Sequence, residues 1–287
     1  MHPKGVEEPN GSTNMARRRG GRSHRSEELP LISLIIGIVF LVFMVSLLIR
    51  FLVGENPWII LIGLGIVGAV TAWRVSVYVQ RIRKYKDTPY YRDTRMPYAD
   101  LRRPGIGFEV DVYNALHLDF PHAKFIPNAL IAREDAVNQY FEIDVVMISR
   151  KGAFAIELKD WAGMIYGGKD DDRWDIGRQH DQQRIVNSYY NPYKQNEKHI
   201  EDLNKIHPFD YHNHVIFSQR GNIGDGMEGV SYYKHFVEHV EKMPDTLDEF
   251  IIKELYAKLN DKLKPHRREQ HIERIKYNQK KYSNRRY

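Results

Sequence analysis

Three charged residues interrupt a stretch of sequence that otherwise has the pattern of buried strands. Asp144, Glu157 and Lys159 lie in EIDVVMISRKGAFAIELKD, residues 142–160. Because alternate residues of a strand share a face, Glu157 and Lys159 point the same way, and the apolar residues that alternate with them point into the opposite layer. Side chains of these types bind metal ions or stabilise charge on a phosphoryl oxygen.

The turn between the two predicted strands decides whether these groups meet. With a two-residue turn at Arg150 and Lys151, Asp144 lies directly opposite Glu157. Opposed residues have Cβ atoms about 4.5 to 5.5 Å apart, and like charges at that distance destabilise a sheet. A positive group is therefore expected between them, whereas a three-residue loop would place Asp144 on the other face.

Two carboxylates and a backbone carbonyl beside them form a set of hard oxygen ligands. This set suits Mg²⁺ or Mn²⁺, and the carbonyl is that of Leu158, between Glu157 and Lys159. Lys159 would hold and polarise a water, or stabilise charge on a phosphoryl oxygen as it develops. A structural interpretation stays open, in which Asp144 pairs with Lys159 or Arg150 as an ordinary ion pair.

The segments around this stretch predict one α/β domain over residues 104–260. Apolar residues at helical spacing predict a helix in GIGFEVDVYNALHLDF, with Glu109 at the border of its buried face. NPYKQNEKHIEDLNKI has the pattern of a second helix, and DTLDEFIIKELYAKL that of a third, with a capping box at Thr246 and Glu249. The remaining segments expected to be strands are AKFIPNALIA, GMIYGG, RWDIGRQ, HVIFS and SYYKHFVEHV.

Two apolar segments precede this domain. Residues 29–53 and 57–79 are each long enough to cross a bilayer as a helix, which takes roughly 20 residues. The first is longer than the apolar region of a signal peptide, which has about 7 to 15 residues. Neither carries an acid, a histidine or a lysine at mid-span, which argues against a transporter. We expect a hairpin of two transmembrane helices that anchors the protein in the lipid bilayer.

Basic residues flank the two apolar segments on the outside only. Five arginines precede the first segment, Arg81, Arg83 and Lys84 follow the second, and the connecting loop carries only Glu55. Loops rich in lysine and arginine stay on the cytoplasmic side. We therefore expect a multi-pass protein of the cytoplasmic (inner) membrane with both termini in the cytoplasm.

The other segments are polar. Residues 1–28 are expected to be disordered, and residues 80–103, which contain several prolines, to form an extended linker. The tail, 261–287, is strongly basic and carries Tyr277 and Tyr282. It is open whether the tail follows a phosphate backbone with both tyrosines stacked on bases, lies on the anionic leaflet or is simply solvated. The chain has no cysteine, which excludes disulfides and thiolate metal sites.

Three blocks of sequence occur in a fixed order. They are GIGFEVDVYNAL, FEIDVVMISRKGAFAIELKDWAG and NPYKQNEKHI, and VIFS follows them. In this order they resemble the nuclease-related domain family, a branch of the restriction-endonuclease-like PD-(D/E)xK superfamily. The resemblance implies an α/β fold with a mixed central sheet flanked by helices.

The resemblance also implies roles for individual residues. Asp144, Glu157 and Lys159 would be the metal-binding and catalytic residues, although the proline of the usual Pro-Asp pair is an isoleucine here. Glu109 on the first helix would help to hold a metal or a water, and Gln195 on the later helix would approach the site.

His199 lies one turn after Gln195. It would contact the substrate if it faces the site, although a lone histidine on a helix is more often a packing or surface residue. Its role therefore stays open.

We expect a membrane-anchored, divalent-metal-dependent nuclease that hydrolyses phosphodiester bonds of nucleic acid, with DNA as the expected substrate, on the cytoplasmic side. Two alternatives stay open. One is a catalytically inactive module that tethers nucleic acid or a protein partner to the membrane. The other is a protein whose transmembrane hairpin itself assembles a membrane complex.

Overall fold

In the computed structural model the described residues are 28–54, 57–132, 140–178, 181–224 and 228–263. The chain divides into two units between Arg74 and Val75. The expected disorder of residues 1–28 falls on residues outside the described ranges, except for Glu28. Of the tail, residues 264–287, which include Tyr277 and Tyr282, also lie outside the described residues, whereas residues 261–263 complete α7 (Glu249–Lys262) and its packing.

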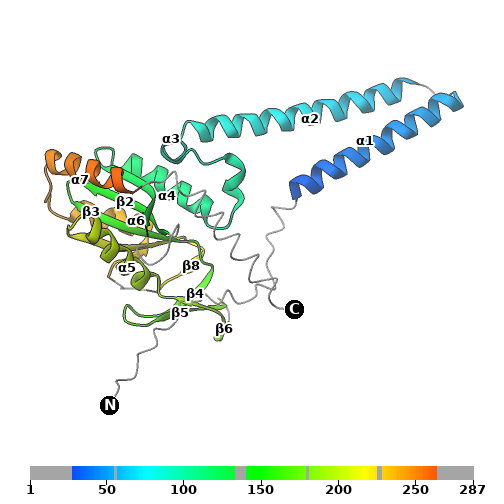
Figure 1. Ribbon diagram of the computed structural model, residues 1–287. Helices are drawn as coiled ribbons and strands as arrows, with labels where there is room; N and C mark the ends of the chain where they lie inside the picture. The colour runs from blue at the N-terminus through cyan, green and yellow to red at the C-terminus, as the bar shows by residue number, and fades with distance from the viewer. Residues whose placement is uncertain (1–27, 55–56, 133–139, 179–180, 225–227, 264–287) are drawn as a thin grey trace, which may run out of the picture. The chain divides into compact units, whose positions relative to one another are not determined.

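The first unit is a pair of helices that run in opposite directions. α1 (Glu28–Val53) is followed by α2 (Pro57–Lys86), which continues past the boundary into the second unit (Figure 1). The ring of Phe43 lies against Gly63, where an added Cβ would be only 2.6 Å from it. Glycine at this position therefore lets the two helices approach closely.

Large apolar side chains of these helices are exposed. Phe51 is 73% exposed and Trp73 is 66% exposed. Among the residues whose side chains the structure describes, one helical segment, Ile62–Lys86, is long and apolar enough to cross a membrane. Val39–Phe51 is a shorter apolar segment. Length and composition thus identify one candidate span in this part of the chain, where the sequence predicted two.

The expected extended linker is a wrong prediction, because residues 80–103 are mostly helical. α2 extends to Lys86, and it is followed by α3 (Pro89–Thr94) and the 3-10 helix η1 (Tyr98–Arg102).

This segment belongs to the second unit, and its tyrosines pack into the core of that unit. Tyr85 and Tyr90 are buried, and the Tyr85 hydroxyl donates a hydrogen bond to the Met96 carbonyl at 2.9 Å. The prolines indicated an extended chain, but Pro89 takes the first position of α3, where its missing N–H costs nothing. The last turns of α2 therefore belong to the core of the second unit.

A mixed five-stranded sheet forms the centre of the second unit. The strand order is β1-β2-β3-β7-β9. β1, β2 and β3 pair antiparallel, whereas β3, β7 and β9 pair parallel. The strands are β1 (Lys124–Ala132), β2 (Tyr140–Ser149), β3 (Gly152–Lys159), β7 (Tyr211–Phe217) and β9 (Val230–Tyr232).

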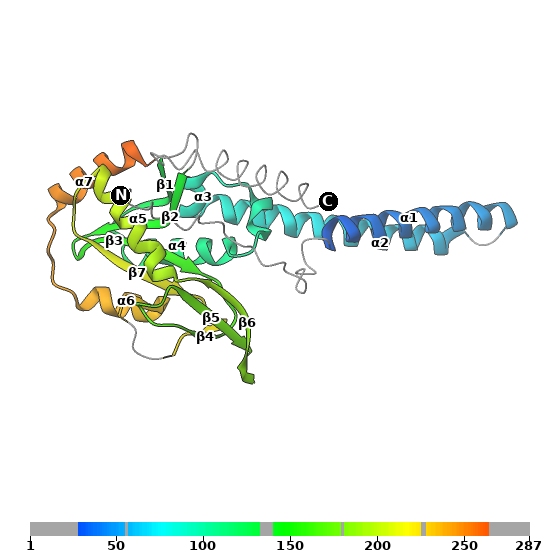
Figure 2. The ribbon, with the colours of Figure 1, turned by 60° about the horizontal axis from the view of Figure 1, so that its bottom comes forward.

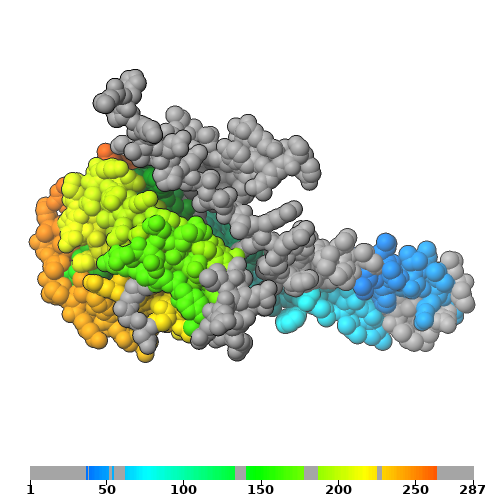
Figure 3. Space-filling model, turned by 90° about the horizontal axis from the view of Figure 1, so that it is seen from below, coloured from blue at the N-terminus to red at the C-terminus, as the bar shows by residue number. Residues whose placement is uncertain are grey.

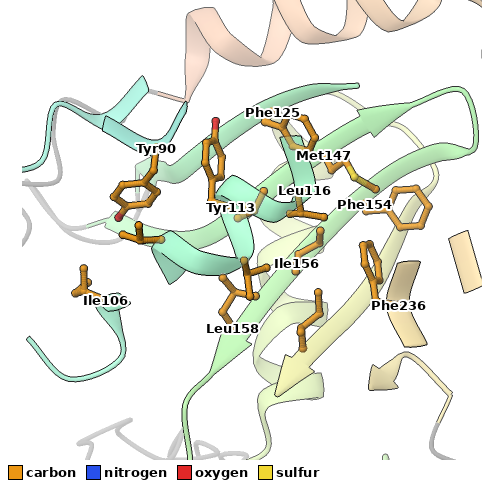
Figure 4. Close-up of a cluster of buried hydrophobic side chains, with 14 of the residues drawn as sticks. Tyr90, Ile106, Tyr113, Leu116, Phe125, Met147, Phe154, Ile156, Leu158 and Phe236 are labelled. Atoms are coloured by element: carbon orange, nitrogen blue, oxygen red, sulfur yellow. The ribbon is translucent and has the colours of Figure 1, made fainter. Parts of the chain in front are cut away.

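Helices cover both faces of this sheet (Figure 1). They are α4 (Ile106–Asp119), α5 (Pro192–Ile206), α6 (Tyr233–Lys242) and α7 (Glu249–Lys262). α3, α4 and α6 share one buried cluster with the sheet, including Tyr113, Phe154 and Phe236 (Figure 4). α5 and α7 share another with the opposite face, including Leu203 and Leu255. A mixed sheet flanked by helices confirms the predicted fold class.

A smaller four-stranded sheet adjoins the main one. Its order is β6-β5-β4-β8, and its strands are β4 (Gly163–Tyr166), β5 (Arg173–Arg178), β6 (Asp181–Tyr190) and β8 (Gly221–Asn222). A third cluster, with Trp174 and Phe217 at its centre, packs this sheet against β7 and the start of α5. Figure 2 shows the β5–β6 hairpin extending away from the main sheet, and Figure 3 shows β4 and β5 beside α5 on one face.

Two further predictions are corrected. SYYKHFVEHV is helix α6 for most of its length rather than a strand, because Phe236 and Val240, one turn apart, are the residues it buries. α7 is capped by Asp248, whose side chain accepts a hydrogen bond from the Ile251 N–H at 2.8 Å. Thr246 instead donates its N–H to the Arg150 carbonyl at 2.7 Å.

The buried position of Tyr85 predicts that the end of α2 stabilises the second unit. Tyr85→Ala should lower the free energy of unfolding by about 3 to 5 kcal/mol, as truncation of other buried aromatic residues does. Tyr85→Phe should cost about 1 kcal/mol, the contribution of one hydrogen bond. Denaturant unfolding of the full chain in detergent measures both.

Tyr78 on the same helix is the matched control, because it is 41% exposed. Tyr78→Ala should cost less than half as much as Tyr85→Ala. Equal small losses for both variants would contradict the packing of α2 described above.

Candidate active site

The β2–β3 turn has the length that brings the two carboxylates together. Ser149 pairs with Gly152 across a two-residue turn, and the register continues to Val145 opposite Ile156. The predicted two-residue turn and its register are therefore confirmed as far as Val145 and Ile156, where the backbone pairing ends before Asp144 and Glu157. Gly152 is required at this turn, since its φ is +140° and an added Cβ would lie 2.8 Å from the ring of His212.

Both β1 and β2 change face beside the site. Ile143 and Val146 belong to the same buried cluster although Val145 between them belongs to the opposite one. Regular alternation is therefore broken at Asp144. Asn128, on the neighbouring strand between the partners of Ile143 and Val145, has a φ of +48°. The left-handed residue therefore lies opposite Asp144, at the position that the β1–β2 pairing skips.

Beyond the last backbone pair of β2 and β3, the Asp144 side chain, rather than a backbone carbonyl, accepts a hydrogen bond from β3. Its Oδ2 accepts a hydrogen bond from the Leu158 N–H at 2.7 Å. The Lys159 carbonyl accepts from the Ser218 N–H on the other side of β3, and successive carbonyls of a strand point in opposite directions. The Leu158 carbonyl therefore points to the Asp144 side of β3, as the sequence prediction requires.

Glu157 and Lys159 lie on the α5 side of β3 and contact each other. Lys159 Nζ forms an ion pair with Glu157 Oε1. Gln195 Nε2 donates to the same oxygen at 2.9 Å, and Gln195 Oε1 lies 3.4 Å from Lys159 Nζ. The structure thus brings together three of the predicted residues, with Gln195 touching both charges.

Burial and mutual repulsion shape the charges of the site. Burial, and then the Glu157 and Glu109 carboxylates, raise the pKa of Asp144 well above its usual range. Burial alone would lower the pKa of Lys159, but the Glu157 and Asp144 carboxylates outweigh it and the pKa is raised. Glu109 on α4 is therefore close enough for its charge to act on both residues. Three carboxylates, those of Glu157, Asp144 and Glu109, thus act on the single ammonium group of Lys159.

His199 is buried beside Glu157 rather than presented at the surface. Its side chain is 7% exposed, and its Nδ1 lies 3.8 Å from Glu157 Oε2. Burial lowers the pKa of His199 despite the nearby carboxylate, so the ring is neutral at pH 7. Within the described residues, neither Glu157 Oε2 nor His199 Nδ1 has a hydrogen-bond partner.

This unpartnered oxygen bears on whether the site fits a metal ion. A buried carboxylate oxygen without a partner is costly, and a cation would satisfy it. Across the described part of the chain, no cluster of three or more His, Cys, Asp or Glu side chains has the spacing to hold a metal. The donors would therefore be Asp144, Glu157 and the Leu158 carbonyl, with water, a set that fits Mg²⁺ or Mn²⁺.

Comparison with known proteins identifies the domain that carries these residues. Residues 104–218, from just before α4 to just after β7, match the nuclease-related domain family. Residues 104–218 form a nuclease-related domain. The matched range includes all of the site residues just described.

The similarity to one curated protein covers less of the chain. An uncharacterized protein of Bacillus anthracis is 37% identical over 62 residues, which are 22% of this chain and 27% of that protein. The chain thus matches little more than a quarter of the length of this relative. No solved structure matches the chain.

Two residues of the nuclease-related domain that position the site were not predicted from the sequence. Asn196 is fully buried and donates to the Ala155 carbonyl at 2.8 Å, which fixes α5 on β3. A signal was present, because Asn196 lies one turn from Tyr193 and two turns before Leu203 on the buried face of the helix. Asn128 gave no signal, because a left-handed residue within a strand has no sequence pattern.

The raised pKa of Asp144 predicts that its charge destabilises the metal-free nuclease-related domain. When a carboxyl has a higher pKa in the folded than in the unfolded protein, its ionisation destabilises the fold. The free energy of unfolding falls as pH rises through the unfolded pKa, and the loss is complete above the folded pKa. Asp144→Asn should therefore raise Tm at pH 7.5 in EDTA, with a smaller gain at pH 5. Asparagine can still accept from the Leu158 N–H.

Asp160→Asn is the control, because the Asp160 carboxylate is paired with Ser218 and Arg220. It should not raise Tm. A lower Tm for Asp144→Asn in EDTA at pH 7.5 would contradict the repulsion inferred for the site.

Proposed function

We propose that the nuclease-related domain is a divalent-metal-dependent nuclease that hydrolyses phosphodiester bonds of DNA. The observation that carries the proposal is the meeting of Asp144, Glu157 and Lys159 at the end of the β2–β3 pairing, with one Glu157 oxygen buried and unpartnered. Two acids, a carbonyl and a lysine form a set that can bind a metal and act on a phosphate.

Asp144, Glu157 and the Leu158 carbonyl would hold Mg²⁺ or Mn²⁺. When bound, the ion would supply neutralisation of phosphate charge and a water of lowered pKa. Glu109 would hold a second water or ion from the α4 side, since its charge already acts on Asp144.

Lys159 would act as a cation rather than as a base. Its raised pKa keeps the ammonium protonated at pH 7, so it can donate hydrogen bonds to a water or to a phosphoryl oxygen but cannot accept a proton. Gln195 contacts Lys159 and Glu157 together and would be the residue that orients both.

We further propose that α1 and α2 anchor the domain to the cytoplasmic face of a membrane, with both termini in the cytoplasm. The exposed apolar side chains of both helices support this, as does the one segment long enough to span. Arg81, Arg83 and Lys84 at the end of α2 fit the cytoplasmic side. The partner of this part of the chain would be the lipid bilayer.

The ion pair between Lys159 and Glu157 favours a second candidate function. Because Lys159 already neutralises Glu157, the domain could keep this arrangement without metal and serve as an inactive module. Such a module would tether nucleic acid or a protein to the membrane.

Mutation of the site tests the nuclease directly. In the full chain in detergent with Mg²⁺ or Mn²⁺, Glu157→Ala and Lys159→Ala should each lower the rate of DNA cleavage by about 100-fold or more, as loss of a group that stabilises the transition state does. Lys258→Ala, which removes an exposed lysine on α7, is the control. Cleavage by either site variant at the parent rate would show that the assignment is wrong.

Metal binding separates the two candidates without an activity assay. At 100 times the Kd, Mg²⁺ or Mn²⁺ should stabilise the parent by about 2.7 kcal/mol, seen as a rise in Tm over the EDTA-treated protein. Asp144→Asn should abolish the rise. An unchanged Tm of the parent in both metals would favour the inactive module.

A further inference from the structure

A stacked pair of aromatic rings lies beside the proposed active site. Trp161 is in the connection between β3 and β4, two residues after Lys159, and Tyr189 is on β6. Their ring centroids are 4.8 Å apart and the planes are inclined by only 27°. Two segments that are separated in the sequence by β4 and β5 thus bring their rings into one stack.

One ring separates this pair from Lys159. In the parallel pairing of β3 with β7, Lys159 lies next to Phe217, and their side chains share a face. The Phe217 ring meets Trp161 edge-on, with centroids 5.5 Å apart and planes at 68°. The pair therefore adjoins the site residues on the same face of the sheet.

The pair is less buried than the aromatic core beneath it. Trp174 and Phe217 are each 1% exposed and stack on each other. Trp161 and Tyr189 are only partly buried. Trp161 packs against this core from outside, and part of the Trp161–Tyr189 surface stays exposed to a ligand.

An exposed cation, Arg220, is held by Asp160, the residue that precedes Trp161. Arg220 is 65% exposed, and its Nη1 donates to Asp160 Oδ2 at 2.8 Å. The other oxygen of Asp160 accepts from the Ser218 hydroxyl at 2.7 Å. Asp160 lies between Lys159 and Trp161, so the guanidinium is held near both and keeps donors for a phosphate.

We propose that the Trp161–Tyr189 pair stacks a base of the substrate strand beside the scissile phosphate, and that Arg220 binds a neighbouring phosphate. Aromatic rings next to a cation are the combination that binds single strands. This inference rests on the proposed function and names its substrate class. A base inside an intact duplex is covered on both sides, so the substrate is a strand with unpaired bases.

Binding of a labelled oligonucleotide tests the proposal without cleavage. The full chain in detergent and EDTA is titrated into fluorescent single-stranded DNA, and anisotropy gives the Kd. Tyr189→Ala should weaken binding about tenfold, within the range for loss of one stacked base. Tyr189→Phe, which keeps the ring, should bind as the parent does.

Tyr190→Ala is the matched control, because Tyr190 is the next residue on β6, 40% exposed, and points to the opposite side of the strand. It should bind as the parent does, and equal Tm values for the two alanine variants exclude unfolding as the cause. A duplex of the same sequence with both ends closed by loops should bind more weakly than the single strand.

An abasic site moved along the oligonucleotide removes the base instead of the ring. The parent should lose about tenfold in affinity at one position, and Tyr189→Ala should be insensitive to the abasic site at that position. Equal binding by Tyr189→Ala and Tyr190→Ala, no abasic effect at any position, or no binding of single-stranded DNA would each overturn the proposal.

Failure of the proposed function has a different signature. If Glu157→Ala cleaves DNA as fast as the parent while the Tyr189 and abasic effects persist, the nuclease assignment fails and the stacking site stands. If Glu157→Ala is inactive and Tyr189→Ala behaves as Tyr190→Ala does, the stacking site alone fails.

Discussion

The central constraint on this site is the repulsion between two carboxylates, the half-buried Asp144 and the buried Glu157. Each would be costly alone in the interior, and each raises the cost of the other. Lys159 offsets part of this repulsion by pairing with Glu157, and the Leu158 N–H offsets another part through Asp144. One Glu157 oxygen has no partner in the described residues, so the balance is incomplete. Incomplete neutralisation of this kind is what a binding site for a divalent cation requires.

The fold around the carboxylates forces them to stay close. A two-residue turn sets the register of β2 and β3, and the left-handed Asn128 lies where the pairing of β1 with β2 skips Asp144. On the other side, Asn196 holds α5 against β3, which brings Gln195 onto both charges. Helices cover both faces of the sheet on which these residues lie. The stability of the sheet thus maintains an arrangement that is unfavourable by itself.

The sequence predicted the centre of this arrangement because local rules decide it. Alternation along β3 placed Glu157 and Lys159 on one face, and an even turn placed Asp144 opposite Glu157. The predictions for the linker and for α6 are wrong for different reasons. Pro89 suggests an extended chain, although proline is also favoured at the start of a helix. The aromatic and β-branched residues of SYYKHFVEHV favour a strand, and the helix is selected by the packing of Phe236 and Val240, one turn apart, on the sheet. Asn128 and the stack of Trp161 on Tyr189 depend on residues far apart in the chain, which periodicity does not detect.

Direct titration with Mn²⁺, followed by the loss of the free-ion signal in electron paramagnetic resonance, tests the central claim that the carboxylates form a cation site. The full chain in detergent, freed of metal with EDTA and exchanged into buffer, should bind Mn²⁺ saturably, and Mg²⁺ should compete for the same site. Asp144→Asn should lose at least about tenfold in affinity, since one of two charged ligands is removed. Binding by Asp144→Asn equal to that of the parent, or no saturable binding by the parent, would contradict the account.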